Sequence, residues 1–513
     1  MQFQDIAEDI LRKIIDAIAN EGIQYLPAVA LTCKRLNGLC DIDNRRSYHC
    51  ILIHSFFDCN AAFNMLLDIL RKPHLGRLNV PFINHPPIWE RNLPDEDVRL
   101  LRAAVRNSGF EGRHEQRVMD MLMQRDAHSH FMTRAYSPAT ARERGVYIGQ
   151  AIAAVLITVC PDIENMAIGT PTARELTWDQ SLMDGAPVHA FPLCRIMKGI
   201  HESPLECGYL SNLRAVELLT PRPGNHMYDQ ADIIGRMEIF QGLPNLETIV
   251  VEGAGWGTRY TTKFNEARFT VGTCGAKNIC ITDSKLGTDV LAGVLSAVSE
   301  LREFTYHTGG RLGHPHFHDA NDYNPCTFFK FLLTHKRTLR ILDLDCDAQL
   351  EEPINTYYDG VKTALEDYPD ELNRTRGPYR RHKKLLRWIF ALKGGLSDFI
   401  GLTHLKIGAK TLVLFALGID TLLSKARAGP YLDGFMLLRA LPPNLQVLTV
   451  RGLRSPIPGT YYGIDWALFR LGGLLARHRP DLVVEGLSPL IRPAYDLARQ
   501  PLPADVYQQI IGP

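Results

Sequence analysis

The sequence predicts an α/β fold in which an N-terminal helical module is followed by an irregular solenoid, a curved parallel sheet with helices on its convex side. Three observations support this prediction: a recurring apolar step, a turn residue before most copies of it, and two amphipathic helical patterns in the first 40 residues. At 513 residues the chain exceeds one ordinary domain, which an elongated stack of repeats accommodates.

The recurring step is an apolar-x-x-apolar-x-apolar pattern, clearest at Leu246, Ile249 and Val251. Its last two positions lie two residues apart and therefore share one face of a short strand. One strand cannot bury that face alone, so the copies are expected to stack as in a solenoid. Ordinary strands of a mixed α/β domain are the alternative. The other copies are Leu213/Val216/Leu218, Leu445/Leu448/Val450, Leu75/Leu78/Val80, Ile163/Met166/Ile168, Leu301/Phe304/Tyr306, Leu339/Leu342/Leu344, Leu402/Leu405/Ile407 and the pair Ile279/Ile281.

Turn residues precede most copies of this step, as in Pro244-Asn245 and Pro443-Asn444. Proline presets φ, and the asparagine side chain bonds its own backbone. Both properties favour a turn where the chain enters each strand.

The first 40 residues predict two amphipathic helices. Ile6, Ile10, Ile14 and Ile18 recur every four residues, so one helix face is strongly apolar. After a short polar connector, a second helix is expected to begin near Tyr25, with a proline in its first turn. A helix pair that caps the end of the solenoid is one explanation of this pattern.

The opening Ile6-Ala-Glu-Asp-Ile10 and the close Thr32-Cys-Lys-Arg-Leu36 resemble an F-box. Two positions depart from that motif, because Ala7 stands where proline is usual and Leu36 where an aromatic residue is usual. The resemblance implies that the helix pair docks a Skp-type adaptor on the cullin scaffold of a ubiquitin ligase. Some apolar residues of the pair must instead pack the two helices together. The resemblance places adaptor contacts among Ile6, Ile10, Ile14, Leu26, Cys33, Leu36 and Leu39.

Beyond the helical module (1–45), changes in composition and in the apolar pattern divide the chain into a solenoid and a C-terminal cap. The solenoid is expected over 46–455, with insertions at about 81–160, 169–210 and 346–400, and a C-terminal cap over 456–513. The second insertion is expected to be a long loop without regular structure, because it contains three prolines and few periodic apolar positions. Its repeats are similar to the degenerate leucine-rich repeats behind fungal F-boxes. Their spacing varies from 25 residues (Ile279 to Phe304) to 63 residues (Leu342 to Leu405), whereas regular repeats have about 20–29. A strand is expected over 48–57, and helices over 60–72, 95–107, 112–126, 138–158, 464–478 and 489–498.

Composition argues against several classes of protein. Lys and Arg number 57 against 56 Asp and Glu, so no global field favours nucleic acid or an acidic membrane. The 11 cysteines include no Cys-x-x-Cys pair, which favours neither a disulfide framework nor a zinc knuckle and suggests the cytoplasm or the nucleus. The longest apolar run, 151–160, is about half a membrane span, so no membrane partner is expected.

Three clusters hold residues with potential chemistry, and each has a simpler explanation. His314, His316 and His318 would share one face of an extended chain, where they could bind a metal ion. The simpler explanation is a solvated, glycine-rich loop. The glycines of 253–257 lack the spacing of a dinucleotide fingerprint. The run 343–347 has the carboxylates of a calcium loop but not its glycine or final glutamate. No cofactor or metal is therefore expected.

The residues between the buried strand positions project from the concave face and form the predicted substrate-binding surface. The middle strands offer acids and the last two offer bases, a gradient that suits a protein or peptide of opposite polarity. Solvated strand faces without a partner are the alternative. A basic run over 374–387 is either an import signal, a phosphate patch or a solvated helix face. The predicted substrate-binding residues are Glu217, Glu252, Glu303, His307, Asp343, Asp345, His404, Lys406 and Arg451.

These observations predict a non-catalytic substrate receptor of a Skp/cullin/F-box ubiquitin ligase that binds an unidentified protein substrate on its repeats. No catalytic residue is predicted, since neither a nucleophile elbow nor a Walker loop occurs in the sequence. An interaction scaffold without a ligase role, and a metal-dependent enzyme that uses the 314–318 loop, are the alternatives.

Overall fold

The computed structural model is an α/β protein with a parallel sheet, which confirms that part of the predicted fold class. The chain divides into two compact units, Met1–Pro221 with Gly242–Leu246 and Arg222–Gln241 with Glu247–Pro513. The boundaries expected near 45 and 455 stay predictions. The described residues are 10, 11, 14, 15, 18, 25–40, 52–53, 56–72, 92–123, 138–160, 163–168, 192–202, 209–219, 229–230, 233–255, 272–309, 323–350, 392–417, 434–453, 464–487 and 490–493.

The first unit combines helices with three parallel strands. β2 (Asn165–Ile168) pairs with β1 (Leu52–Ile53) on one side and with β3 (Ala215–Leu219) on the other. α5 (Phe56–Arg71) packs along the long helix α8 (Pro138–Val159). The other helices described here are α2 (Leu26–Ala30), α3 (Lys34–Cys40), α6 (Asp95–Asn107), α7 (Arg113–Met123) and α11 (Pro192–Glu202).

Helix α11 corrects the prediction of an insertion without regular structure over 169–210. Its first residue is Pro192, whose fixed φ and missing N–H suit the first turn of a helix. Leu193, Ile196 and Ile200 are buried at helical spacing. The prolines of this segment obscured a short but regular apolar pattern.

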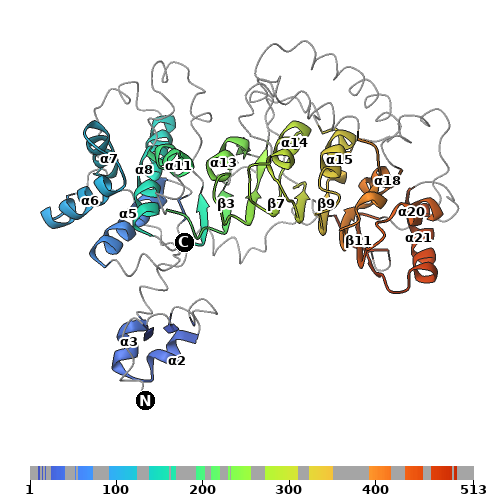
Figure 1. The fold of residues 1–513 in the computed structure, drawn as a ribbon, viewed down its shortest axis with the longest axis horizontal. Coiled ribbons are helices and arrows are strands. Elements are labelled where there is room, and N and C mark those ends of the chain that lie inside the picture. The colour runs from blue at the N-terminus through green and yellow to red at the C-terminus, as the bar shows by residue number, and fades with distance from the viewer. Residues whose placement is uncertain are drawn as a thin grey trace, which may run out of the picture. The chain divides into compact units, whose positions relative to one another are not determined.

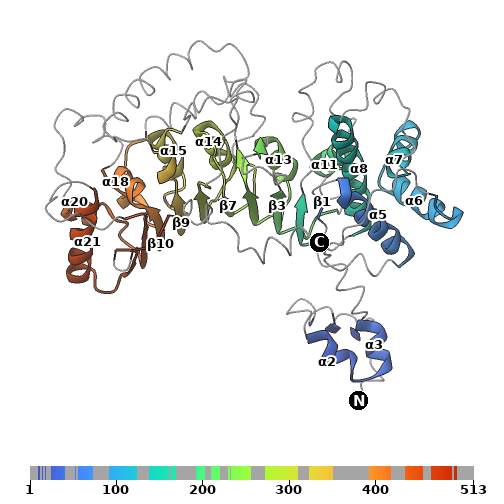
Figure 2. The same cartoon turned by 180° about the vertical axis from the view of Figure 1, so that it is seen from behind.

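The second unit is built on an open parallel sheet. Figures 1 and 2 show its helices along one side of the strands. A separate pair joins β4 (Asp229–Gln230) to β6 (Ala254–Gly255). The strands follow the order β5 (Thr248–Glu252), β7 (Asn278–Thr282), β8 (Glu303–His307), β9 (Ile341–Asp345), β10 (His404–Gly408), β11 (Val447–Arg451) and β12 (Val483–Glu485). The helices are α13 (Ile233–Phe240), α14 (Thr288–Ala297), α15 (Pro325–Leu333), α18 (Ala409–Leu417), α20 (Gly434–Ala440) and α21 (Ile464–His478), with short 3-10 turns at Asp347–Gln349 and Leu396–Asp398.

The predicted apolar positions of this unit lie in register across the strands. Ile279 of β7 is paired with Phe304 of β8, and Phe304 with Leu342 of β9. Leu405 and Leu448 continue the same row on β10 and β11. These side chains are 0–2 % exposed, so the repeated step marks the core face of the sheet. The copy at 75–80 lies outside the described residues.

Two asparagine side chains at strand entries form hydrogen bonds to the turn before the neighbouring strand. Asn444 Nδ2 donates to the carbonyl oxygen of Ile400, 2.7 Å away, in the turn before β10. In the first unit, Asn245 Nδ2 donates in the same way to the carbonyl oxygen of Ser211, 2.6 Å away. The prediction that these asparagine side chains bond their own backbone is wrong for these two bonds. Each instead bonds a carbonyl oxygen in the turn before the neighbouring strand, which holds the two turns together.

The C-terminal part differs from its prediction in one strand and one helix. β12 continues the sheet beyond β11, although its three residues lack the apolar step. Its side chains alternate between exposed and half-buried, as expected for the last described strand of a sheet. The helix expected over 489–498 is absent from its described residues, since 490–491 form isolated bridges instead.

Candidate functional site

The N-terminal helices form a module with its own small core. Described residues of the first helix, Leu11 and Ile15, pack with Leu26 of α2 and with Leu36 and Leu39 of α3. All five are less than 9 % exposed. The helix expected to follow Tyr25 is divided into α2 and α3 by a turn, in which Thr32 Oγ1 donates to the carbonyl oxygen of Val29.

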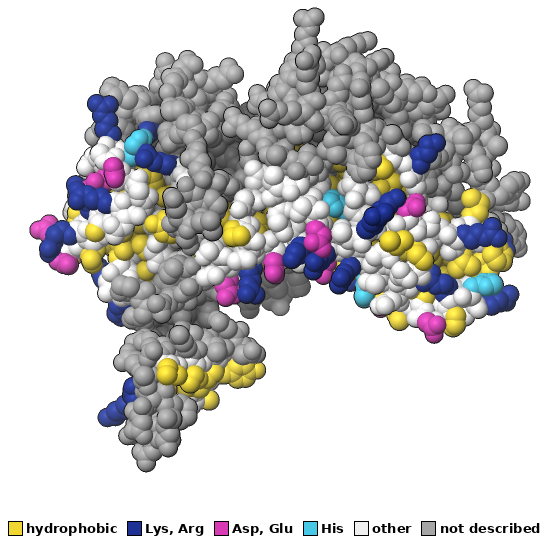
Figure 3. Space-filling view, viewed as in Figure 1, with side chains coloured by type: hydrophobic (Ala, Val, Ile, Leu, Met, Phe, Trp, Pro, Cys, Tyr) yellow, Lys and Arg dark blue, Asp and Glu magenta, His cyan; other side chains and the backbone are white. Residues whose placement is uncertain are grey.

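Large apolar side chains are also exposed on this module. Ile10 and Ile14, one turn apart on the first helix, are 49 % and 39 % exposed. Tyr25 and Leu31, on either side of α2, are 54 % and 87 % exposed. Figure 3 shows apolar surface gathered on the module. Four such side chains close together in the sequence are typical of a surface that a partner covers.

The structure divides the seven predicted adaptor contacts into two groups. Leu26, Leu36 and Leu39 belong to the core of the module, whereas Ile10 and Ile14 are exposed. Cys33 is half-buried, and its Sγ accepts from the N–H of Leu36. Ile6 lies outside the described residues. Tyr25 and Leu31 are exposed as well but are not among the seven predicted contacts. Leu31 lies in the turn between α2 and α3, outside the buried core of the module.

The second candidate surface is the polar face of the second unit's sheet, opposite the helices. Its side chains are the outward positions of the strands, which alternate with the buried ones. Two rows run across it in register: Thr248, Asn278, Glu303, Ile341, His404, Val447 and Val483; then Val250, Cys280, Thr305, Asp343, Lys406, Thr449 and Glu485. A third set of positions consists of three pairs on neighbouring strands, Glu252 with Thr282, His307 with Asp345, and Gly408 with Arg451.

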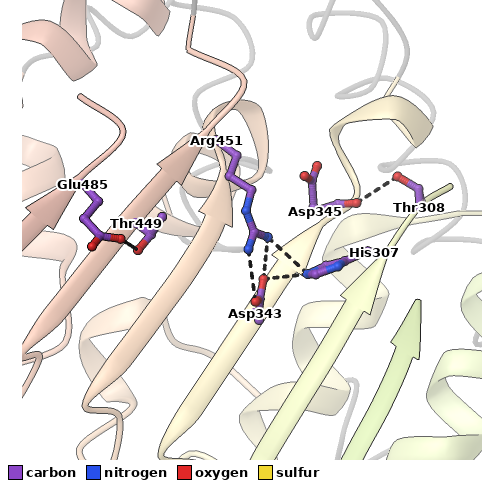
Figure 4. A network of polar contacts seen from close by, with 7 residues as sticks. All are labelled: His307, Thr308, Asp343, Asp345, Thr449, Arg451 and Glu485. Atoms are coloured by element: carbon purple, nitrogen blue, oxygen red, sulfur yellow. Dashed lines mark hydrogen bonds and ion pairs between the residues drawn. The ribbon is translucent and has the colours of Figure 1, made fainter. Parts of the chain in front are cut away.

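A network of three side chains lies at the centre of the polar face (Figure 4). Arg451 Nη1 and Nη2 donate to the two carboxylate oxygens of Asp343, at 2.6 and 3.2 Å. His307 Nε2 lies 2.7 Å from Asp343 Oδ1 and 3.1 Å from Arg451 Nη1. These side chains, on β8, β9 and β11, are only 12–19 % exposed, so water screens their charges weakly. We call His307, Asp343 and Arg451 the strand network.

The strand network spans β10 without using a residue from it. The residue of β10 in register with Arg451 is Gly408, so no side chain stands beside Arg451 there. A Cβ at this position would lie 2.3 Å from Oδ1 of Asp347. Asp347 in turn accepts the N–H groups of Lys410 and Thr411 and thereby caps α18. Glycine at position 408 therefore leaves room for the carboxylate that caps α18.

The ionised form of Asp343 is stabilised in the folded protein. Burial alone would raise the pKa of its carboxyl group, but hydrogen bonds from His307 and Arg451 outweigh burial and hold this pKa below its ordinary value. Beside it, burial raises the pKa of the Cys280 thiol, and the Asp343 charge raises it further. The centre of the polar face thus holds a fixed ion pair and a protonated thiol.

The other predicted substrate-binding residues are spread around this centre. Glu303 is exposed, and Glu252, His404 and Lys406 are half-buried. Asp343 and Asp345 were both expected to face solvent, but they are 8 % and 0 % exposed, so this prediction is wrong for both residues. Glu217 is half-buried on β3 of the first unit.

Pairing within the sheet changes the predicted charge gradient. The expected gradient treated the acids of the middle strands and the bases of the last two as available to a ligand. Arg451 instead neutralises Asp343 within the face. A further contact on this face is the hydrogen bond from Thr449 Oγ1 to Glu485 Oε2, at 2.9 Å. The two residues are paired across β11 and β12, and this pairing was not predicted because no strand was expected at 483–485.

In the run 343–347, the Asp347 carboxylate accepts the N–H groups of Lys410 and Thr411 at the start of α18. Among the described residues, no three His, Cys, Asp or Glu side chains are grouped so that they could hold a metal ion. The histidines at 314–318 and the basic run at 374–387 lie outside those residues. In the described part of the chain, no helix has the length and apolar character that a bilayer span requires.

Comparison with known proteins gives no family for this chain: no family model and no curated protein matches it. The two candidate surfaces differ in chemistry. The helical module presents exposed aliphatic and aromatic side chains, and the sheet presents a rigid charged network. Both arrangements suit binding to other proteins, through apolar contact at the first and through hydrogen bonds at the second.

Proposed function

We propose that this chain is a non-catalytic substrate receptor of a Skp/cullin/F-box ubiquitin ligase. In this proposal the N-terminal helices dock a Skp-type adaptor, and stacked repeats of the degenerate leucine-rich type bind a protein substrate in the cytoplasm or nucleus. A separate enzyme of the complex transfers ubiquitin to that substrate.

One observation carries the proposal: apolar side chains stay exposed on a helical module whose core is already complete. Leu11, Ile15 and Leu26 bury their side chains within the module, so the exposed Ile10 and Ile14 are not needed to close it. Burying an isoleucine side chain in an interface contributes about 1.5–3 kcal/mol before the costs of association. The sequence resemblance to an F-box names the partner that such a surface would fit.

The polar face supports the substrate-binding half of the proposal. The strand network pairs its own charges, so it holds neighbouring strands in a fixed arrangement, and a face that is already ordered costs a bound substrate less entropy. Glu303 and Lys406 lie on the same face, within two strands of the network. This arrangement suits a protein surface or an extended segment whose polar groups match these positions.

The test of the proposal is adaptor binding by the double variant Ile10→Asp/Ile14→Asp. Both side chains are exposed, so the variant is expected to keep the helical circular dichroism of the wild type. Two charges in a desolvated interface are expected to weaken binding of a purified Skp-type adaptor at least tenfold by isothermal titration calorimetry, which corresponds to about 1.4 kcal/mol.

The matched control is Val483→Asp on β12, because Val483 is 54 % exposed and lies on a strand far along the chain from the module. This variant is expected to bind the adaptor as the wild type does. Failure of the wild type to bind adaptor, or equal binding by wild type and double variant, would reject the ligase role and favour an interaction scaffold.

A further inference from the structure

The last two described helices of the second unit, α20 and α21, expose large apolar side chains. Phe435 and Met436 on α20 are 42 % and 38 % exposed, and Phe469 on α21 is 55 % exposed. The two helices pack closely, because an added Cβ at Gly434 would lie 3.1 Å from Leu471 N of α21. We call Phe435, Met436, Arg439, Phe469, Gly473 and Arg477 the terminal helix patch; Figure 3 shows apolar and basic side chains interspersed over these helices.

This surface conflicts with the role of a solenoid cap. A cap ends a stack of repeats and requires a polar outer face, because no further repeat covers it. Helix α21 instead buries Leu468, Leu471 and Leu475 on its inner side and exposes an aromatic ring on its outer side. Phe469 stacks on Trp466, with ring centroids 6.1 Å apart, which holds it on the outer surface.

The charges around the apolar side chains are mostly positive. Helices α20 and α21 together contain three arginines and one histidine, and Asp465 in the first turn of α21 is their one acidic residue. Arg439 and Arg477 are exposed. The ring of Phe435 lies 6.1 Å from that of His478, so this exposed apolar side chain of α20 lies against the basic C-terminal end of α21.

Gly473 gives a second indication that this surface receives a partner. It lies inside α21, where glycine costs about 1 kcal/mol relative to alanine. A Cβ at Gly473 would meet no atom within 4 Å, so packing within the chain does not require glycine there. It is exposed one helical turn after Phe469, which leaves a shallow gap where the backbone of another helix can approach closely.

We propose that the terminal helix patch binds an acidic amphipathic helix of a partner protein. The partner's apolar side chains would contact Phe435, Met436 and Phe469, and its carboxylates would pair with Arg439 and Arg477. A second copy of this chain is a poor occupant, because two basic patches repel each other. This interaction is additional to the proposed adaptor and substrate sites and does not depend on either.

The test uses the full chain and a fluorescein-labelled, 20-residue helical peptide with leucines on one face and glutamates on the other. A matched peptide carries lysines in place of the glutamates, and vesicles of phosphatidylcholine with phosphatidylserine provide an anionic surface. Fluorescence anisotropy is expected to show binding of the glutamate peptide at least tenfold tighter than that of the lysine peptide. Phe469→Asp and Arg477→Glu are each expected to weaken it at least tenfold, whereas Val483→Asp is expected to leave it unchanged.

Charge exchange separates a specific site from a change in folding. The double variant Arg439→Glu/Arg477→Glu is expected to lose affinity for the glutamate peptide and to bind the lysine peptide instead. A misfolded variant would bind neither peptide. Absence of glutamate-peptide binding, equal affinity for both peptides, or binding unaffected by Phe469→Asp would overturn the proposal. Binding to the anionic vesicles without binding to the glutamate peptide would overturn it in favour of a lipid surface.

Discussion

The two faces of the second unit's sheet are made by the same strands but specified in different ways. On the helix-covered face, the strands β5 and β7–β11 contribute apolar residues at the same two positions, such as Phe304 and Tyr306 on β8. On the polar face, the rows contain different residues from strand to strand, and Arg451 pairs with Asp343 two strands away. The first face is repetitive and the second is unique.

This difference indicates that the buried face determines the fold of the sheet, whereas the polar face carries the contacts that are specific to this chain. On the buried face, neighbouring strands pack together as long as each position in a row is apolar. The number of residues between successive strands can therefore vary. The polar face gains a fixed geometry only where particular residues meet, as at the strand network. Variants that affect the two faces differently test this comparison.

The largest effect is expected from truncation on the helix-covered face. Phe304 is fully buried, and its ring centroid lies 6.0 Å from that of Phe328 on α15. Phe304→Ala leaves a cavity between strand and helix and is expected to cost about 3–5 kcal/mol of unfolding free energy. Urea unfolding followed by circular dichroism measures this change.

The matched control is Glu303→Ala, one residue earlier on the exposed side of the same strand. Substitution of an exposed residue is expected to change the free energy of unfolding by about 0.5 kcal/mol or less. Similar costs for both variants would show that β8 does not have one buried and one polar face.

The same contrast explains how much could be predicted from the sequence. Ile279, Phe304 and Leu342 were assigned to one buried row because a strand has a period of two and each copy repeats it. No local pattern links Arg451 to Asp343, since their contact depends on the order of β9, β10 and β11 in the sheet. The division of the helical module into buried Leu36 and exposed Ile10 likewise required the packing of three helical segments.

An intermediate effect is expected from the strand network. Arg451→Ala leaves the Asp343 carboxylate mostly buried beside His307 alone, and removing one partner of a buried ion pair costs about 3 kcal/mol.

The pKa of Asp343 is lowered in the folded state, so the contribution of this carboxylate to stability is present at neutral pH and is lost as the pH falls below its ordinary pKa of 3.8. Urea unfolding at pH 7 and pH 3 is therefore expected to show a smaller acid-induced loss for Arg451→Ala than for the wild type.

The control for this prediction is Asp343→Asn/Arg451→Ala, which removes both charges. The double variant is expected to be less destabilised than the sum of the two single variants, because the buried carboxylate no longer lacks its partner. Additive effects of the two substitutions would contradict a coupled pair on the polar face.

The smallest effect is expected at the edge of the polar face, where Thr449 donates to Glu485. Thr449 is 4 % exposed, whereas Glu485 is exposed on the last described strand. Thr449→Val keeps the shape of the side chain and removes one hydrogen bond, which is expected to cost about 1 kcal/mol. Glu485→Gln retains an acceptor and is expected to cost about 0.5 kcal/mol or less, because water solvates either side chain. If Thr449→Val costs as much as Arg451→Ala in the same urea titration, stability on the polar face is distributed along its rows rather than concentrated in the strand network.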